Sequence, residues 1–66
     1  MERSIEDLRL EFAKIYPNLP EKVRNEDIIV VIDKKPHTWN SAFFEIKNNT
    51  ELGRKMLKKL GMTGII

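Results

Sequence analysis

The only tryptophan and the only histidine of the chain lie within residues 34–40, beside Lys34 and Lys35. An aromatic side chain next to cations could stack on a base or on an exposed nucleotide. However, the largest side chain of a small domain is usually needed for burial. We therefore favour the interpretation in which Trp39 closes the end of the core and His37 is an exposed loop residue.

The second half of the chain is basic. Residues 34–66 hold seven Lys or Arg against two Asp or Glu, whereas residues 1–33 hold five against eight. Four of these cations share the polar side of a predicted helix and could lie along phosphates, although such an arc is more often a solvated helix face. No helix-turn-helix, zinc-finger, RNA-recognition or KH pattern is present. Nucleic-acid binding is therefore an alternative function, using Lys34, Lys35, Trp39, Arg54, Lys55, Lys58 and Lys59.

Asp33, Glu45 and Lys47 have the bare D…ExK spacing of metal-dependent nucleases. In such sites two carboxylates hold Mg²⁺, and the lysine helps to activate water or to stabilise developing charge. The same residue types also occur by chance on the wet face of many strands, and these nuclease domains usually need a larger scaffold. We therefore interpret these residues as part of a solvated strand face and keep a Mg²⁺-dependent nuclease as a remote alternative.

No other set of residues marks a catalytic or metal site. The chain has no cysteine and one histidine, which excludes a Cys/His zinc site of its own. Ser4, Ser41 and His37 have no sequence context that marks a nucleophile. We therefore predict a protein that is not an enzyme, with no catalytic residues, no metal and no cofactor.

Residues 28–32, IIVVI, carry five branched side chains in succession and give the strongest structural signal in the sequence. Side chains branched at Cβ fit an extended, pleated strand. Pro36 cannot donate a ladder hydrogen bond, so residues 33–37 are predicted as a connection and residues 41–47 as the return strand. Because residues 28–32 are apolar on both faces, they should form a central strand.

Two amphipathic patterns predict helices on either side of this hairpin. Ser4 can cap a first helix that ends near Tyr16, before a proline. A single turn could start at Pro20. Thr50 can cap a second helix that continues to about Leu60, where Gly61 can take the left-handed cap conformation.

The predicted fold is a small α+β domain over residues 1–66, in the order helix, strand, strand, helix. An antiparallel hairpin packs on the two helices, which share one face of the sheet, and residues 62–66 could pair as a short C-terminal strand. The predicted core consists of Ile5, Leu8, Phe12, Ile15, Val30, Ile32, Phe44, Ile46, Leu52, Met56 and Leu60.

Composition suggests a cytoplasmic protein. The chain has no cysteine, which suits a reducing compartment, and no apolar run approaches the roughly 18 residues that span a bilayer. The N-terminus is too charged for a signal peptide. A chain of 66 residues usually builds a core worth about 3–5 kcal/mol of net stability, so association with another chain would help.

A sheet with helices on one face leaves its other face uncovered. We therefore predict a binding or regulatory module that acts through protein contacts, most simply as a twofold homodimer. The dimer could form by edge pairing or by face-to-face packing. In the competing account the chain is a monomer, and Ile65 and Ile66 fold over the open face. The predicted partner-binding residues are Leu10, Ile29, Val31 and Phe43.

Overall fold

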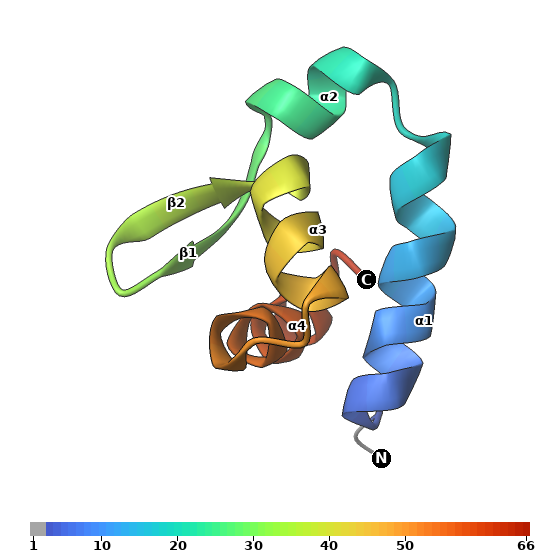
Figure 1. Cartoon of the computed structure of the whole chain (residues 1–66), viewed down its shortest axis with the longest axis vertical. Coiled ribbons are helices and arrows are strands. Elements are labelled where there is room, and N and C mark those ends of the chain that lie inside the picture. The colour runs from blue at the N-terminus through green and yellow to red at the C-terminus, as the bar shows by residue number, and fades with distance from the viewer. Residues whose placement is uncertain (1–2) are drawn as a thin grey trace.

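The computed structural model describes residues 3–66 and confirms an α+β fold in which a two-stranded antiparallel hairpin packs against helices (Figure 1). No helix in this part of the chain is long and apolar enough to cross a membrane. The elements in chain order are α1 (Ile5–Ile15), η1 (Tyr16–Asn18), α2 (Glu21–Glu26), β1 (Ile28–Ile32), β2 (Lys35–Thr38), α3 (Trp39–Lys47) and α4 (Glu51–Thr63).

The first helix begins and ends where the sequence predicts. Ser4 is its N-cap, and its hydroxyl accepts a hydrogen bond from the Asp7 amide. The helix gives way to the short 3₁₀ turn η1 at Tyr16, before Pro17. The predicted turn after Pro20 is the six-residue helix α2, whose N-cap is Pro20 itself.

The hairpin is tighter than predicted. Asp33 and Lys34 both have positive φ, 51° and 69°, and form a two-residue turn of type I′ between β1 and β2. The return strand is therefore β2 and not residues 41–47, and Pro36 lies within it and not in a connection. Within residues 3–66, β1 pairs with β2 alone, so the prediction of a central strand was wrong.

Pairing positions explain how Pro36 fits in β2. Ile32 and Lys35 flank the turn, and Val31 lies opposite Pro36. Cross-strand pairs alternate between hydrogen-bonded and non-hydrogen-bonded types, and the pair that closes a two-residue turn is hydrogen-bonded. Pro36 therefore occupies a non-hydrogen-bonded position, where the missing N–H would face away from β1.

Residues 41–47 form most of α3. The Thr38 hydroxyl caps this helix by accepting from the Ser41 amide. Its buried residues Trp39, Ala42 and Ile46 are spaced by three and four positions, which is the helical period. Phe44 falls outside this stripe and is 62% exposed, so its assignment to the core was wrong.

The C-terminal helix runs one turn longer than predicted. The Thr50 hydroxyl caps α4 by accepting from the Gly53 amide, as predicted. Gly61, predicted as the left-handed cap, lies inside the helix, and Gly64 takes that conformation instead with φ of 80°. Residues 62–66 extend α4 and its C-terminal cap, so no third strand forms among the described residues.

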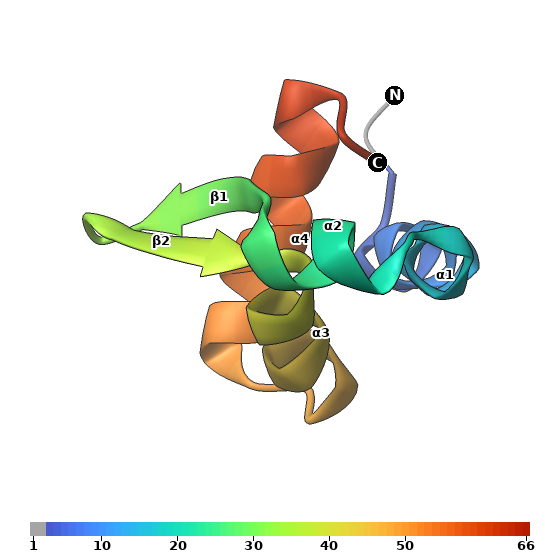
Figure 2. The same cartoon turned by 90° about the horizontal axis from the view of Figure 1, so that it is seen from above.

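The core lies between α1, α3 and α4. α1 packs against α4 at the side away from the hairpin, while α4 also packs against β1 (Figures 1 and 2). The two predicted helices therefore do not share one face of the sheet. The largest fully buried side chains are Phe12, Met56, Leu57 and Leu60.

Most of the predicted core is confirmed. Ile5, Ile15 and Leu52 are half-buried at its margin. The core also contains Ala42 and Leu57, which the prediction left out, and Trp39, which was predicted to close its end.

Candidate protein-docking face

A β-bulge decides which side chains of β1 face solvent. Ile28 lies opposite Thr38 and Val30 lies opposite His37, so Ile29 is an extra residue in the ladder. An extra residue shifts the alternation of side chains by one position. Ile28 and Val31 therefore face outward, 53% and 44% exposed, whereas Val30 and Ile32 are buried.

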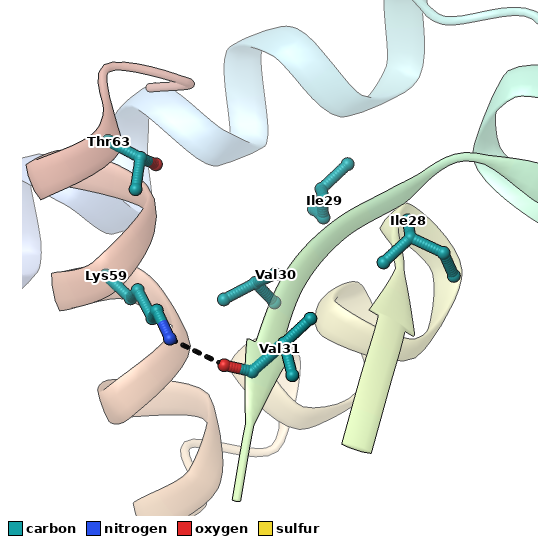
Figure 3. A pocket seen from close by; sticks show the side chains of 6 residues that line it. All are labelled: Ile28, Ile29, Val30, Val31, Lys59 and Thr63. Carbon is teal, nitrogen blue, oxygen red and sulfur yellow. Dashed lines mark hydrogen bonds between the residues drawn. The ribbon is translucent and has the colours of Figure 1, made fainter. Parts of the chain in front are cut away.

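These two side chains are next to each other on one side of the strand. Figure 3 shows Ile28 and Val31 on one side of β1 and Ile29 and Val30 on the other. Val31 lies opposite the exposed Pro36 of β2, which adds a third apolar side chain. We call Ile28, Val31 and Pro36 the outward face.

A shallow groove adjoins this face, between β1 and the C-terminal half of α4. Its volume is about 300 Å³, and it is lined by Ile28, Ile29, Val30, Val31, Lys59 and Thr63. The Lys59 ammonium crosses the groove and donates to the Val31 carbonyl over 2.7 Å (Figure 3). The Lys59 side chain of α4 thus occupies a backbone acceptor, the Val31 carbonyl, at the edge of β1 that does not pair with β2.

The predicted partner-binding residues do not form one surface. Leu10 is 61% exposed, but it lies on α1, and Val31 is exposed on the outward face. Ile29 is half-buried and packs against the core. Phe43 is half-buried on α3, where its ring stacks on Tyr16 with centroids 4.2 Å apart.

Sequence reasoning missed Ile28 as part of this face, because strict alternation groups it with the buried Val30 and Ile32. The bulge is encoded in no single residue of the IIVVI run. No signal in the sequence would have located it.

The cations proposed for nucleic-acid binding differ in their availability. Lys34 and Lys35 at the hairpin and Lys55 and Lys58 on α4 are exposed. Lys59 is held by the Val31 carbonyl, and Arg54 donates from Nη1 to the Asn49 carbonyl over 3.0 Å. All six cations are exposed, and within residues 3–66 Lys34, Lys35, Lys55 and Lys58 are the ones without a hydrogen bond or salt bridge.

Trp39 belongs to the core. It is 7% exposed, and its ring lies 5.5 Å from that of Phe12, centroid to centroid. The interpretation of Trp39 as a buried closing residue is thus confirmed, and its ring has no open face on which a base could stack. His37, expected to be exposed, is half-buried, with Nδ1 2.8 Å from the Ser41 hydroxyl.

We expect no binding to mixed single- and double-stranded oligonucleotides at low salt. Trp39 is buried and two of the proposed cations are engaged with backbone carbonyls, which leaves too few contacts for appreciable affinity. Fluorescence anisotropy at two salt concentrations measures this. Binding that weakens steeply with salt and is lost in Lys55→Glu/Lys58→Glu would revive the nucleic-acid alternative.

The three residues of the D…ExK spacing do not lie on two successive strands, as the nuclease alternative expects. Asp33 is in the hairpin turn, whereas Glu45 and Lys47 are on α3 and not on a strand. The Glu45 carboxylate accepts from the Thr50 hydroxyl over 2.8 Å. Across residues 3–66 no three His, Cys, Asp or Glu side chains are grouped to hold a metal ion.

Comparison with protein-family models, with curated proteins and with solved structures finds no match to this chain. The case for a binding site on this chain therefore rests on the geometry of the outward face and of the exposed lysines. Of the two, the outward face is the surface whose exposure costs free energy, because its side chains are branched and apolar.

Proposed function

We propose that this protein is a small, non-enzymatic binding module that acts through protein–protein contacts and self-associates as a homodimer. The observation that carries the proposal is the outward face, where the bulge places Ile28 and Val31 together in solvent. A two-stranded hairpin is marginal in water on its own, and this one has no layer on its outer side among the described residues. A partner on that side would stabilise it.

Adjacency separates the outward face from exposed apolar residues that stand alone on a helix. Single exposed apolar side chains are common on soluble proteins and need no partner. Leu10 on α1 and Phe44 on α3 are exposed in this way. Ile28, Val31 and Pro36 instead share one face of one hairpin, which makes them the better docking surface.

The same proposal places the protein in the cytoplasm, where a chain without cysteines meets a reducing environment. A module of this size would then work through association and not through chemistry of its own.

Glutamate at Ile28 and Val31 is expected to abolish self-association while the chain stays folded. Full burial of a branched aliphatic side chain is worth about 1.5–3 kcal/mol, so the double substitution should weaken association at least ~100-fold. Sedimentation equilibrium over a tenfold or greater range around micromolar measures this. The wild type should rise from 7.8 kDa towards twice that mass, and Ile28→Glu/Val31→Glu should stay at 7.8 kDa.

Leu10→Glu is the matched control, because Leu10 is at least as exposed but lies on α1. It should associate like the wild type, and circular dichroism should show all variants folded. A wild-type mass of 7.8 kDa at every concentration would contradict self-association. Dissociation by Leu10→Glu alone would move the contact away from the hairpin.

A further inference from the structure

We infer that the second copy docks face to face on the outward face with its hairpin antiparallel, so that each hairpin tip lies over the partner's hairpin base. This inference rests on the proposed self-association and adds its geometry. It selects between the two dimers that the sequence leaves open, edge pairing and face packing, and it fixes the direction of the contact.

The free edge of β1 is closed to an incoming strand. Edge pairing needs backbone acceptors and donors in a regular row, and natural edges are often blocked by bulges and by lysines. In β1 the Val31 carbonyl already accepts from Lys59 over 2.7 Å. The bulge between Ile28 and Val30 also breaks the regular row. An added strand would have to displace Lys59 and match a bulged ladder.

The free edge of β2 is closed by a different device. Pro36 occupies a position at which a backbone N–H would face the free edge, and proline has none. β2 has only four residues, so losing one donor leaves little to pair with. With both edges blocked, the outward face is the part of the hairpin left for a partner.

Charges along the hairpin set the direction of docking. Exposed Glu26 and Asp27 precede β1 at the base of the hairpin, where they sum to −2. At the tip, Asp33 with exposed Lys34 and Lys35 sums to +1. Neither end contributes to a salt bridge found within residues 3–66. Parallel stacking would put like charge on like charge, whereas antiparallel stacking about a twofold axis places each tip on an opposite charge.

Distance makes the two directions easy to tell apart. A strand rises about 3.3 Å per residue, so the tip and base of one hairpin are roughly 20 Å apart. In an antiparallel dimer, Lys34 of one copy therefore approaches Asp27 of the other, while the two Lys34 residues stay far apart. Face-packed sheets lie about 10 Å apart, so a bifunctional thiol reagent of about that span can join residues that face each other, but not residues at opposite ends of the hairpin.

Single cysteines test this arrangement directly, because the chain has no cysteine of its own. Lys34→Cys and Asp27→Cys are mixed in equal amounts with this reagent, in the buffer in which the wild type is a dimer. We expect crosslinked pairs that join the two variants in several-fold excess over crosslinked pairs of either variant with itself. Predominant self-crosslinking of Lys34→Cys would mean parallel stacking and would overturn the inference.

Charge reversal supplies a second readout in which no cysteine is present. Lys34→Glu/Lys35→Glu should weaken self-association about tenfold at low salt and less at high salt, because the tip then repels the partner's base. Adding Glu26→Lys/Asp27→Lys to the same chain should restore association, because an antiparallel dimer then again places each tip on a base of opposite charge, whereas a parallel dimer would still place like charge on like. No effect of either reversal would also overturn the inference.

The outcomes separate the inference from the proposed function. If the wild type dimerises and Ile28→Glu/Val31→Glu dissociates it, the protein-contact function stands even when the crosslinks show the wrong direction. If that double variant still dimerises, the contact lies outside the outward face and the face-to-face arrangement fails. A wild type that never dimerises removes the proposed self-association and the inference together.

Discussion

Replacing Gly53 with alanine is expected to destabilise the protein by about 3 kcal/mol, which approaches the whole stability of a domain this small. A Cβ atom at this position would lie 2.5 Å from the Glu45 carbonyl oxygen and 2.9 Å from the Ile46 amide nitrogen. Both atoms belong to the backbone of α3, which cannot move without shifting the helix. α3 and α4 must therefore separate, which opens the core around Met56 and Leu57.

Urea unfolding followed by circular dichroism measures this loss, and Gly61→Ala is its control. Gly61 is also inside α4, but a Cβ there would meet the Leu8 side-chain Cδ2 at 2.8 Å, and Leu8 can change rotamer. Alanine also gains up to about 1 kcal/mol of helix propensity, which offsets the crowding. Equal stabilities of the two variants would contradict the close approach of α3 to α4.

Trp39→Ala is expected to cost about 3–5 kcal/mol and to leave the chain largely unfolded at 25 °C. Trp39 begins α3 directly after the hairpin and packs its ring against Phe12 of α1. Removing the indole leaves a cavity where three elements meet. The loss should appear as a lower urea midpoint, or as missing helical signal without denaturant.

Trp39→Phe is the conservative comparison, because it keeps an aromatic ring in the same site. We expect it to fold and to lose only part of the stability, about 1–2 kcal/mol. If Trp39→Ala instead kept wild-type stability, the side chain would not be part of the core, and a role in ligand stacking would become the better account of it.

Local chemistry in the sequence determined the ends of several elements and the presence of the strand. Ser4 and Thr50 cap helices because a hydroxyl at that position accepts from a free backbone amide of the first turn, and this requires no other part of the fold. The run at residues 28–32 is extended because β-branched side chains favour that conformation. These features suffice for the α+β class.

Tertiary structure decided the return strand and the helix α3. In residues 41–47 the apolar positions fit a period of two, which predicts a strand, but Trp39, Ala42 and Ile46 also fit a helical stripe. The short type I′ turn at Asp33 and Lys34 brings residues 35–38 onto β1, and the remaining residues are then free to pack on α4 as a helix. When an apolar pattern fits both a strand and a helix, the neighbouring element that buries its side chains decides which of the two forms.

The docking face was decided in the same way. The sequence shows that β1 has more apolar side chains than one face can bury, but it does not show where the alternation breaks. Burial of Val30 and Ile32 against the core turns Val31 to the outside, and Ile29 as the extra residue of a bulge turns Ile28 to the same side. The sequence therefore predicted an exposed apolar surface. Which residues form that surface depends on the register of β1 against β2, and packing on α4 fixes that register.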